Sequence, residues 1–324
     1  MTVIGFHVSH EQLAPDAALD ALRAAESAGF AAALCSDHAN PWSRAQGHSG
    51  AAWPWLGAAL ATTGLRIGVV TSPGGRYHPA VLAQQAATLG QMFPARFWMA
   101  PGTGEYLNES ITGEPWPRPE IRGRRLVESV DVIRRLFAGE CVTHDGLVTV
   151  VDAEVWDRPS EPVPLLAPVV GVSSAERAAQ WADGLLTLNQ PVEVLRDLLA
   201  AYRESGGRGP ACLQVHLSWA ETEGHAEAIA LDQWRNNVVS PPVTWDLATV
   251  DHFEALGPRT TADQVRESVR VSADLSRHRD WILEYAELGF DEIYLHHVGQ
   301  DQSAFVETFG NRVLPDLRDE EVTR

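Results

Sequence analysis

The sequence contains no lysine, so all 25 of its Lys and Arg residues are arginines. This absence excludes catalysis through a lysine Schiff base and phosphate binding by lysine. The 43 acidic residues leave the chain with a formal net charge of −18. Because a chain this acidic repels nucleic acid and anionic lipid, we expect neither a nucleic-acid partner nor a membrane partner.

Cysteine is scarce and unpaired. Cys35, Cys141 and Cys212 are far apart and none of them belongs to a CxxC pair. Their spacing argues against a disulfide framework and a zinc site, so we predict no metal. The first residues have no basic start, and no segment approaches the ~20 apolar residues of a membrane span. The sequence therefore predicts a cytoplasmic protein without a signal peptide.

Strand-like and helix-like segments alternate along almost the whole chain. The predicted strands are Val3–Val8, Ala31–Ser36, Arg66–Thr71, Arg96–Ala100, Val163–Val170, Gly184–Leu188, Leu213–Trp219 and Glu292–Val298. The predicted helices are Pro15–Ala28, Trp53–Thr62, Pro79–Met92, Arg122–Ala138, Ala175–Ala182, Val192–Ser205, Ala226–Asn236, Arg279–Leu288 and Ser303–Leu314. Apolar strands that alternate with helices indicate a parallel sheet, and eight such units favour a closed (β/α)8 TIM barrel.

Two segments interrupt this alternation. Residues from about 141 to 160 hold an Asp-Gly pair between alternating apolar residues, which predicts a β-hairpin insertion. Residues from about 238 to 262 are irregular and carry Pro241, Pro242 and Pro258, so we expect a loop over one end of the barrel. Since no linker rich in serine or glycine divides the chain, we predict that residues 1–324 form one domain with these two insertions.

Active sites of such barrels lie at the carboxyl ends of the strands, so polar residues directly after a strand are candidates. Asp37 and His38 follow the second predicted strand. A histidine beside a carboxylate can act as a general acid or base. The simpler interpretation is a loop hydrogen bond at Asp37, with His38 as a bystander.

A glycine-rich turn follows the fourth predicted strand. Gly102 and Gly104 flank Thr103 and precede Glu105 and Asn108. Glycines let a flat ligand or a phosphate approach the backbone closely, and the two polar side chains are candidate contacts to a ring. The turn lacks the third glycine of the dinucleotide-binding fingerprint. An ordinary tight turn is the alternative.

Two further groups of residues follow later strands. Gly171, Ser173 and Ser174 open a predicted helix, where small hydroxyls and free amides suit a phosphate, or where a serine simply caps the helix. His296 and His297 end the last strand. Because no carboxylate or cysteine lies near them at ligand spacing, we interpret them as core or rim histidines rather than zinc ligands.

Five segments together resemble the bacterial luciferase-like monooxygenase superfamily, near its branch of dehydrogenases that use the deazaflavin coenzyme F420 to oxidise glucose 6-phosphate. The segments are SDHANPW (36–42), RYHPAVLAQ (76–84), GTGEYLNE (102–109), WADGLLT (181–187) and HHVGQDQ (296–302). The resemblance spans nearly the whole chain. It implies a TIM barrel, a small-molecule substrate and a homodimer.

The resemblance also implies roles for single residues. His38 matches a proposed acid or base beside the hydride-carrying carbon of the cofactor, and Trp42 and Glu105 match residues of the same active site. The implied cofactor contacts are Asp37, Val70, Thr71, Gly102, Thr103, Gly104 and Asn108. A protein that only binds the cofactor, without turnover, has no chemical need for His38, Trp42 and Glu105 together.

This chain departs from the sugar-phosphate branch in two ways. That branch is implied to hold the sugar phosphate with two lysines and an arginine, whereas here Pro191 lies at or near one lysine position and no lysine is present. Glucose 6-phosphate is therefore not the expected substrate. The oligoglutamate tail of the deazaflavin also favours a basic groove, which an acidic chain without lysine offers less readily.

A small subgroup of the superfamily, regarded as a return from the deazaflavin to FMN, also looks much like this chain. We therefore predict an FMN-dependent oxidoreductase of the monooxygenase type that acts on an unknown small organic substrate. Two alternatives stay open. One is an F420-dependent dehydrogenase that takes hydride from a non-phosphorylated alcohol or sugar, and the other is a flavin-binding protein without catalytic turnover.

Overall fold

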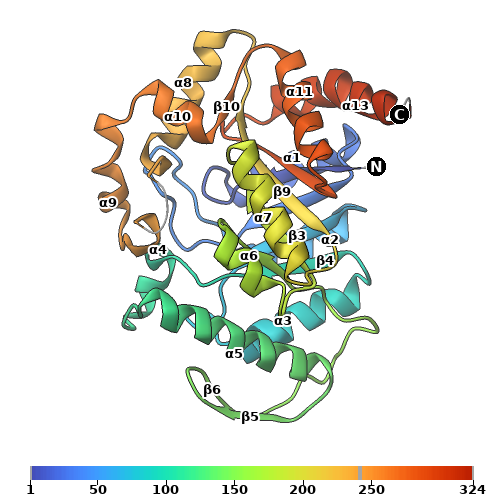
Figure 1. Cartoon of the computed structure of the whole chain (residues 1–324), viewed down its shortest axis with the longest axis vertical. Coiled ribbons are helices and arrows are strands. Elements are labelled where there is room, and N and C mark those ends of the chain that lie inside the picture. Colours follow the sequence, from blue (N-terminus) through green and yellow to red (C-terminus); the bar gives the residue numbers. More distant parts are fainter. Residues whose placement is uncertain (1, 240–242, 323–324) are drawn as a thin grey trace.

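The computed structural model describes residues 2–239 and 243–322, and its main sheet is a ring of parallel strands with helices around it (Figure 1). Eight strands follow the order β4-β3-β2-β1-β11-β9-β8-β7. They are β1 (Val3–Val8), β2 (Ala32–Ser36), β3 (Arg66–Thr71), β4 (Phe97–Pro101), β7 (Leu166–Pro168), β8 (Gly184–Leu188), β9 (Ala211–Ser218) and β11 (Glu292–His297). The predicted (β/α)8 barrel is confirmed. A short strand, β10 (Arg270–Val271), was not predicted and pairs with β9.

Few hydrogen bonds join β4 to β7, the two strands between which the ring closes. An isolated parallel bridge joins Met99 to Leu165, and the Met99 amide donates to the Pro164 carbonyl at 3.1 Å. The other junctions are regular ladders; β9 and β11, for example, pair from Cys212↔Glu292 to Leu217↔His297. The barrel is therefore nearly closed, with one weak junction.

Helices cover the outer face of the ring. The longer ones are α1 (Pro15–Ser27), α2 (Ala52–Thr62), α3 (Pro79–Met92), α5 (Pro119–Phe137), α7 (Val192–Glu204), α8 (Glu223–Trp234), α11 (Leu275–Glu287) and α13 (Leu314–Val322). The short ones include α4 (Tyr106–Glu109), α6 (Val172–Ala178), α10 (Ala262–Ser268), α12 (Ser303–Thr308) and the π-helical turn η5 (Phe309–Val313). No helix in the described part of the chain combines the length and the apolar character needed to cross a bilayer.

The two interruptions take definite forms. β5 (Val142–Asp145) and β6 (Thr149–Ala153) form an antiparallel pair outside the ring (Figure 1). Among described residues, 243–262 hold short helices rather than a plain loop: η3 (Thr244–Asp246), α9 (Val250–Glu254) and η4 (Gly257–Arg259). Thr249 caps α9 by accepting from the His252 amide, a local signal too short to predict a helix. Pro241 and Pro242 lie outside the described residues.

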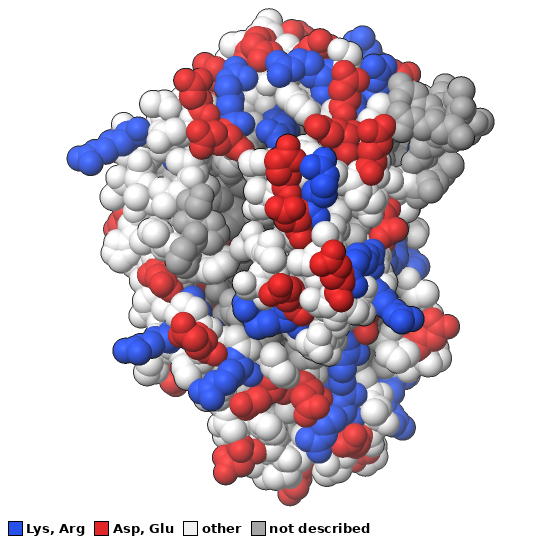
Figure 2. Space-filling view, in the orientation of Figure 1, with Lys and Arg blue, Asp and Glu red and all other residues white. Residues whose placement is uncertain are grey.

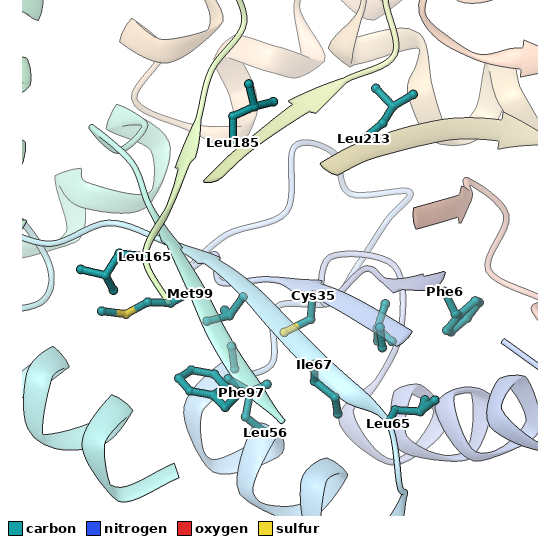
Figure 3. Packing of buried hydrophobic residues seen from close by; sticks show 14 of the residues in the cluster. Phe6, Cys35, Leu56, Leu65, Ile67, Phe97, Met99, Leu165, Leu185 and Leu213 are labelled. Carbon is teal, nitrogen blue, oxygen red and sulfur yellow. The ribbon is translucent and has the colours of Figure 1, made fainter. Parts of the chain in front are cut away.

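Successive strand residues alternate between two hydrophobic clusters, because side chains along a strand point to opposite faces. The outward cluster packs between strands and helices, and Figure 3 shows Ile67 and Phe97 close to Leu56 of α2. The inward cluster fills the barrel and consists of Ala32, Leu34, Trp98, Ala100, Leu166, Leu186, Cys212 and Tyr294. Both faces of each strand are thus buried, as expected for a parallel barrel.

Two aromatic side chains and two glycines fill the barrel interior together. Trp98 and Tyr294 have ring centroids 6.1 Å apart. A Cβ on Gly68 would lie 2.1 Å from the Trp98 ring, and one on Gly5 would lie 2.5 Å from the Tyr294 ring. Only glycine leaves room for these rings at both positions. An ion pair between Arg66 and Glu292, with the Tyr294 hydroxyl donating to Glu292, closes the amino-terminal end of the barrel.

We expect Gly68→Ala to destabilise the protein by roughly 1–3 kcal/mol, because the added methyl group overlaps the buried Trp98 ring. Gly123→Ala is the matched control, since a Cβ there has no neighbour within 4 Å, and it lies in the middle of α5. It should be neutral or stabilise by up to ~1 kcal/mol. Thermal unfolding of both variants checks this, and equal melting temperatures would contradict the packing account.

Candidate active site

A buried ion pair joins the loops that follow β1 and β2. The Nδ1 atom of His38 lies 3.0 Å from Oε1 of Glu11, and their side chains are 15% and 1% exposed. The other carboxylate oxygen accepts hydrogen bonds from the hydroxyls of Ser9 at 2.7 Å and Ser36 at 2.8 Å. β1 and β2 are paired neighbours, which brings their carboxyl ends together. With Nδ1 engaged, Nε2 is the ring nitrogen left to meet a ligand.

The two partners shift each other's protonation. Burial alone would lower the pKa of His38, but the charge and hydrogen bond of Glu11 outweigh it and raise the pKa to about 9. Burial alone would raise the pKa of Glu11, but the charge of His38 and the hydrogen bonds from His38, Ser9 and Ser36 hold this pKa well below its usual range. At neutral pH the pair is therefore an imidazolium beside a carboxylate.

Trp42 connects this pair to a second carboxyl group. Its ring packs edge-on against His38, with centroids 4.8 Å apart, and its Nε1 donates to Oε2 of Glu105 at 3.4 Å. Burial raises the pKa of Glu105, although the charge of His38 and the Trp42 hydrogen bond oppose the shift. The structure thus brings the three predicted catalytic residues together at the carboxyl ends of β2 and β4.

Asn108 links the loop after β2 to the loop after β4 by hydrogen bonds. Its Oδ1 accepts from the backbone amides of Ala39 at 2.9 Å and Asn40 at 3.3 Å, and its Nδ2 donates to Oε2 of Glu105 at 3.4 Å. Both ends of the amide are engaged within the protein. Asn108, predicted to contact the cofactor, therefore also positions Glu105 against the loop that carries His38.

Asp37 is surrounded by donors. Its Oδ1 accepts from Arg76 Nη2 and the Tyr77 hydroxyl, both at 3.2 Å, and its Oδ2 accepts from the Thr71 hydroxyl at 2.8 Å and Trp53 Nε1 at 3.2 Å. This buried carboxylate fixes the start of the loop after β2. The Thr71 hydroxyl donates its proton to Asp37. If either side chain contacts a cofactor, it does so while it keeps its hydrogen bonds within the protein.

A glycine turn at residues 102–104, called the cradle below, follows β4 and packs against the loop after β3. Gly104 has φ +82°, and a Cβ there would lie 2.7 Å from the Ser72 hydroxyl. That hydroxyl is buried and has no hydrogen-bond partner. Gly102 donates its amide to the Thr71 carbonyl at 2.8 Å, and Thr103 lies between the two glycines. Two positions without a side chain beside an unpartnered buried hydroxyl fit the polar edge of a flat heterocycle.

The other predicted cofactor contacts, Val70 and the residues at the start of α6, differ in which of their groups are free to bind a ligand. Val70 is half-buried and packs against the inward cluster. At the start of α6, Ser174 donates to the Gly171 carbonyl at 2.6 Å and accepts from the Gly171 amide at 3.2 Å. Its hydroxyl is therefore engaged in the turn that begins the helix, while Ser173 is exposed. A phosphate at this position would meet Ser173 and backbone amides rather than the Ser174 hydroxyl.

Neutral histidines line the barrel interior below the site. His296, predicted as a core residue, has its ring centroid 4.5 Å from that of His7 and 5.2 Å from that of His216. Burial lowers the pKa of both His7 and His216 to about 3. Trp234 packs on His216 at 4.5 Å and on Trp42 at 5.8 Å, so it links this floor to the catalytic group. In the described residues no cluster of histidine, cysteine and carboxylate side chains is arranged to hold a metal ion.

Sequence reasoning missed Glu11, Arg76 and Trp234. The rule that polar residues after a strand are candidates would have found Glu11, which follows β1 by three positions. Trp234 ends a helix, and no local pattern distinguishes it from an ordinary packing residue.

A parallel barrel that carries a histidine–carboxylate pair, a second carboxyl group and a glycine turn at one end has the construction of an enzyme that binds a flat cofactor. The chain belongs to the luciferase-like monooxygenase family, whose family model matches residues 1–292. It is therefore an oxidoreductase, and the prediction of an enzyme is confirmed.

Several relatives match along the whole chain. An F420-dependent glucose-6-phosphate dehydrogenase of Beutenbergia cavernae is 35% identical and covers 98% of both chains, and that of Nakamurella multipartita is 35% identical with 97% and 96% covered. A solved F420-dependent secondary alcohol dehydrogenase, in complex with an F420–acetone adduct, superposes with a TM-score of 0.91 at 29% identity over 98% of this chain and 100% of that one.

These relatives correct the predicted cofactor and reaction. FMN and the FMN-dependent monooxygenase reaction are wrong as the main prediction, because relatives at 30–35% identity over the full chain are F420-dependent dehydrogenases. The prediction relied on the resemblance to the FMN subgroup and on the acidic composition without lysine, whose net charge of −18 is a sum over the whole chain. Such a sum does not describe the local field at the site, where Arg76 lies beside Asp37.

We expect Glu11→Gln to lower the pKa of His38 well below about 9, because the charge and hydrogen bond of Glu11 are lost and only the charge of Glu105 then opposes burial. Titration of the histidine ring by NMR measures this shift. Glu128→Gln is the control, since Glu128 pairs with His144 at 3.1 Å in a separate part of the fold. An unchanged pKa of His38 in Glu11→Gln would show that the pair does not set its protonation.

Proposed function

We propose that this protein is a coenzyme F420-dependent dehydrogenase that oxidises a non-phosphorylated alcohol. The observation that carries the proposal is the Glu11–His38 ion pair, which lies with Trp42 and Glu105 at the carboxyl ends of the strands. The similarity to F420-dependent dehydrogenases along the whole chain supports the cofactor. A cytoplasmic location remains a prediction from the sequence.

The cofactor would be held at the cradle. Ser72 has an unpartnered hydroxyl there, and Gly102 and Gly104 flank Thr103 without side chains of their own. Bound F420 supplies the acceptor for the hydride that leaves the alcohol carbon. Glu105, whose pKa is raised by burial, can hold a proton at its carboxyl group on the same side of the site.

His38 is the group that moves the substrate proton. In alcohol oxidation its Nε2 would take the proton of the hydroxyl group, and the carboxylate of Glu11 would stabilise the imidazolium that forms. In carbonyl reduction the same imidazolium would return the proton. Because the pKa of His38 is about 9, oxidation should speed up as the pH rises toward 9, whereas reduction should slow down above it.

The surroundings of the site favour a small neutral substrate. The histidines below it are uncharged, since burial lowers the pKa of His7 and His216 to about 3. Arg76 is engaged by the carboxylate and carbonyl of Asp37. The indoles of Trp42 and Trp234 add apolar surface beside His38. With no lysine in the chain, these features suit an alcohol that carries no phosphate.

The proposal is tested by incubating the protein and F420 with propan-2-ol, longer secondary alcohols, neutral sugars and glucose 6-phosphate, and following the loss of deazaflavin fluorescence. We expect turnover with a neutral alcohol and a pH profile of kcat/KM that rises toward about 9. His38→Ala should lower kcat at least ~100-fold while F420 still binds, because it removes the general base. Equal activity in His38→Ala, or no binding of F420, would overturn the proposal.

We infer that the protein forms a homodimer through α2 and α3. Neither helix carries a charged side chain, although 21% of all residues are charged. The two helices follow the paired strands β2 and β3, so they are neighbours around the barrel. α3 exposes Val81 (45%) and Met92 (58%). Two chains of net charge −18 repel each other, and a face without charge is where they can meet.

A charge on this face should separate the copies. We expect Val81→Glu to convert a dimer to a monomer, as measured by light scattering after size-exclusion chromatography. Val194→Glu on α7 is the control, since Val194 is similarly exposed at 38% and should leave the dimer intact. A monomeric wild-type protein, or a dimer that survives Val81→Glu, would refute this interface.

A further inference from the structure

Four glutamines from separate segments of the chain meet beside the catalytic group. They are Gln12 after β1, Gln46 after β2, Gln233 in α8 and Gln300 after β11. Gln12, Gln46 and Gln233 are at most 5% exposed. Basic and acidic side chains are interspersed over the outer face shown in Figure 2, whereas these four amides carry no charge. Since β2, β1 and β11 are neighbours in the ring, a neutral polar network joins the loops of adjacent strands.

The network rests on the neutral histidines below the site. The Nε2 atom of Gln12 donates to Oε1 of Gln233 at 3.2 Å and to the Val298 carbonyl. Its Oε1 lies 2.7 Å from Nε2 of His296. Because an amide oxygen can only accept, neutral His296 carries its proton on Nε2 and donates it to Gln12. Both ends of the Gln12 amide are therefore fixed by buried partners.

Gln46 connects this network to the loop that carries Trp42. Its Oε1 accepts from the backbone amide of Trp42 at 3.0 Å, and its Nε2 donates to the Gln233 carbonyl at 3.2 Å. The carbonyl of Gln46 accepts from Nε2 of Gln300 at 2.8 Å, and that of Ala45 accepts from Nε2 of Gln233 at 3.3 Å. Residues 37–51 form neither helix nor strand. Their position therefore depends on side-chain hydrogen bonds rather than on a regular backbone ladder.

The two other buried glutamines adjoin residues of the site. Gln12 directly follows Glu11, and Gln233 directly precedes Trp234. The ring of Trp234 lies 5.8 Å from that of Trp42. An amide group donates and accepts hydrogen bonds without bringing a charge, so the network can join these segments without disturbing the protonation of the buried ion pair.

We propose that Gln46 is a positioning residue that holds the indole of Trp42 against His38. The inference rests on the proposed function, because it concerns the reaction in which His38 takes the substrate proton. Trp42 packs edge-on against His38 at 4.8 Å and donates to Glu105 at 3.4 Å, and one orientation of the indole serves both contacts. A displacement of roughly 1 Å in such a group can lower a rate by about 100-fold.

The first test needs no cofactor. Gln46→Met removes both hydrogen bonds of the amide at nearly unchanged volume. In protein with 15N-labelled tryptophan, the indole N–H signal of Trp42, identified by its loss in Trp42→Phe, reports on the hydrogen bond to Glu105. We expect Gln46→Met to shift this signal. The pKa of His38 should stay near about 9, because Glu11 sets it.

Gln302→Met is the matched control. Gln302 is also a buried glutamine, and its Nε2 donates to the His297 carbonyl at 3.0 Å rather than to the loop of Trp42. Its variant should leave the Trp42 signal unchanged. If Gln46→Met does not fold, as thermal unfolding would show, Gln300→Met is the milder variant. It removes the hydrogen bond to the Gln46 carbonyl and should shift the same signal by a smaller amount.

The second test measures turnover with F420 and a neutral alcohol that the wild-type protein oxidises. We expect Gln46→Met to lower kcat roughly tenfold, because the indole is displaced, with the midpoint of the pH profile unchanged. Gln302→Met should retain the wild-type kcat.

Each other outcome has a separate meaning. An unchanged Trp42 signal in Gln46→Met would overturn the proposal, and so would a shifted signal with an unchanged kcat. A lower kcat together with a shifted pKa of His38 would assign the effect to the ion pair, which also overturns it. If the wild-type protein oxidises no alcohol with F420, the proposed function fails, whereas a shifted Trp42 signal would still support the role of Gln46 in placing the indole.

Discussion

The ion pair between Glu11 and His38 is the interaction on which the catalytic end of this barrel depends. Removing two charges from water is unfavourable, and the cost is offset only when further hydrogen bonds satisfy the remaining atoms. Ser9 and Ser36 supply those bonds to Glu11. The four residues come from the ends of two paired strands, so the parallel ladder of β1 and β2 sets the geometry of the ion pair.

The groups that stabilise the barrel and the polar groups of the candidate site lie at different positions along its axis. One end is closed by the ion pair of Arg66 and Glu292, and the middle is filled by the rings of Trp98 and Tyr294. Toward the other end the interior becomes polar, with neutral histidines and then the charged pair. The apolar packing of Trp98 and Tyr294 supports the histidines and the charged pair, and it keeps these polar groups in place.

Much of the fold was predictable because its signals are local. The predicted bounds of Val3–Val8, Arg66–Thr71 and Gly184–Leu188 agree with the strands of the structure. The helix predicted from Arg122 begins at Pro119, where proline suits the first turn. The strand β10 has two residues, too few to leave a periodic pattern.

The site was predictable in part. His38, Trp42 and Glu105 could be named from short motifs, and the fold brings them together. Trp234 could not, because its role depends on contacts with residues distant in the chain. The cofactor prediction failed because it relied on a resemblance to one subgroup and on a net charge, which carries no information about position. The uncharged helices α2 and α3 show how unevenly charge is placed on this molecule.

The junction of β4 with β7 has a consequence for how the barrel can deform. Its other strands are joined by continuous ladders, whereas here one bridge between Met99 and Leu165 closes the ring. Opening this junction sacrifices fewer hydrogen bonds than opening any other, so it has the lowest resistance to breathing motions. The loop that carries Glu105 lies on one side of it and the start of α6 on the other. The barrel can therefore widen beside the loop that carries Glu105, while the continuous ladder of β1 and β2 on the far side keeps the Glu11–His38 pair in place.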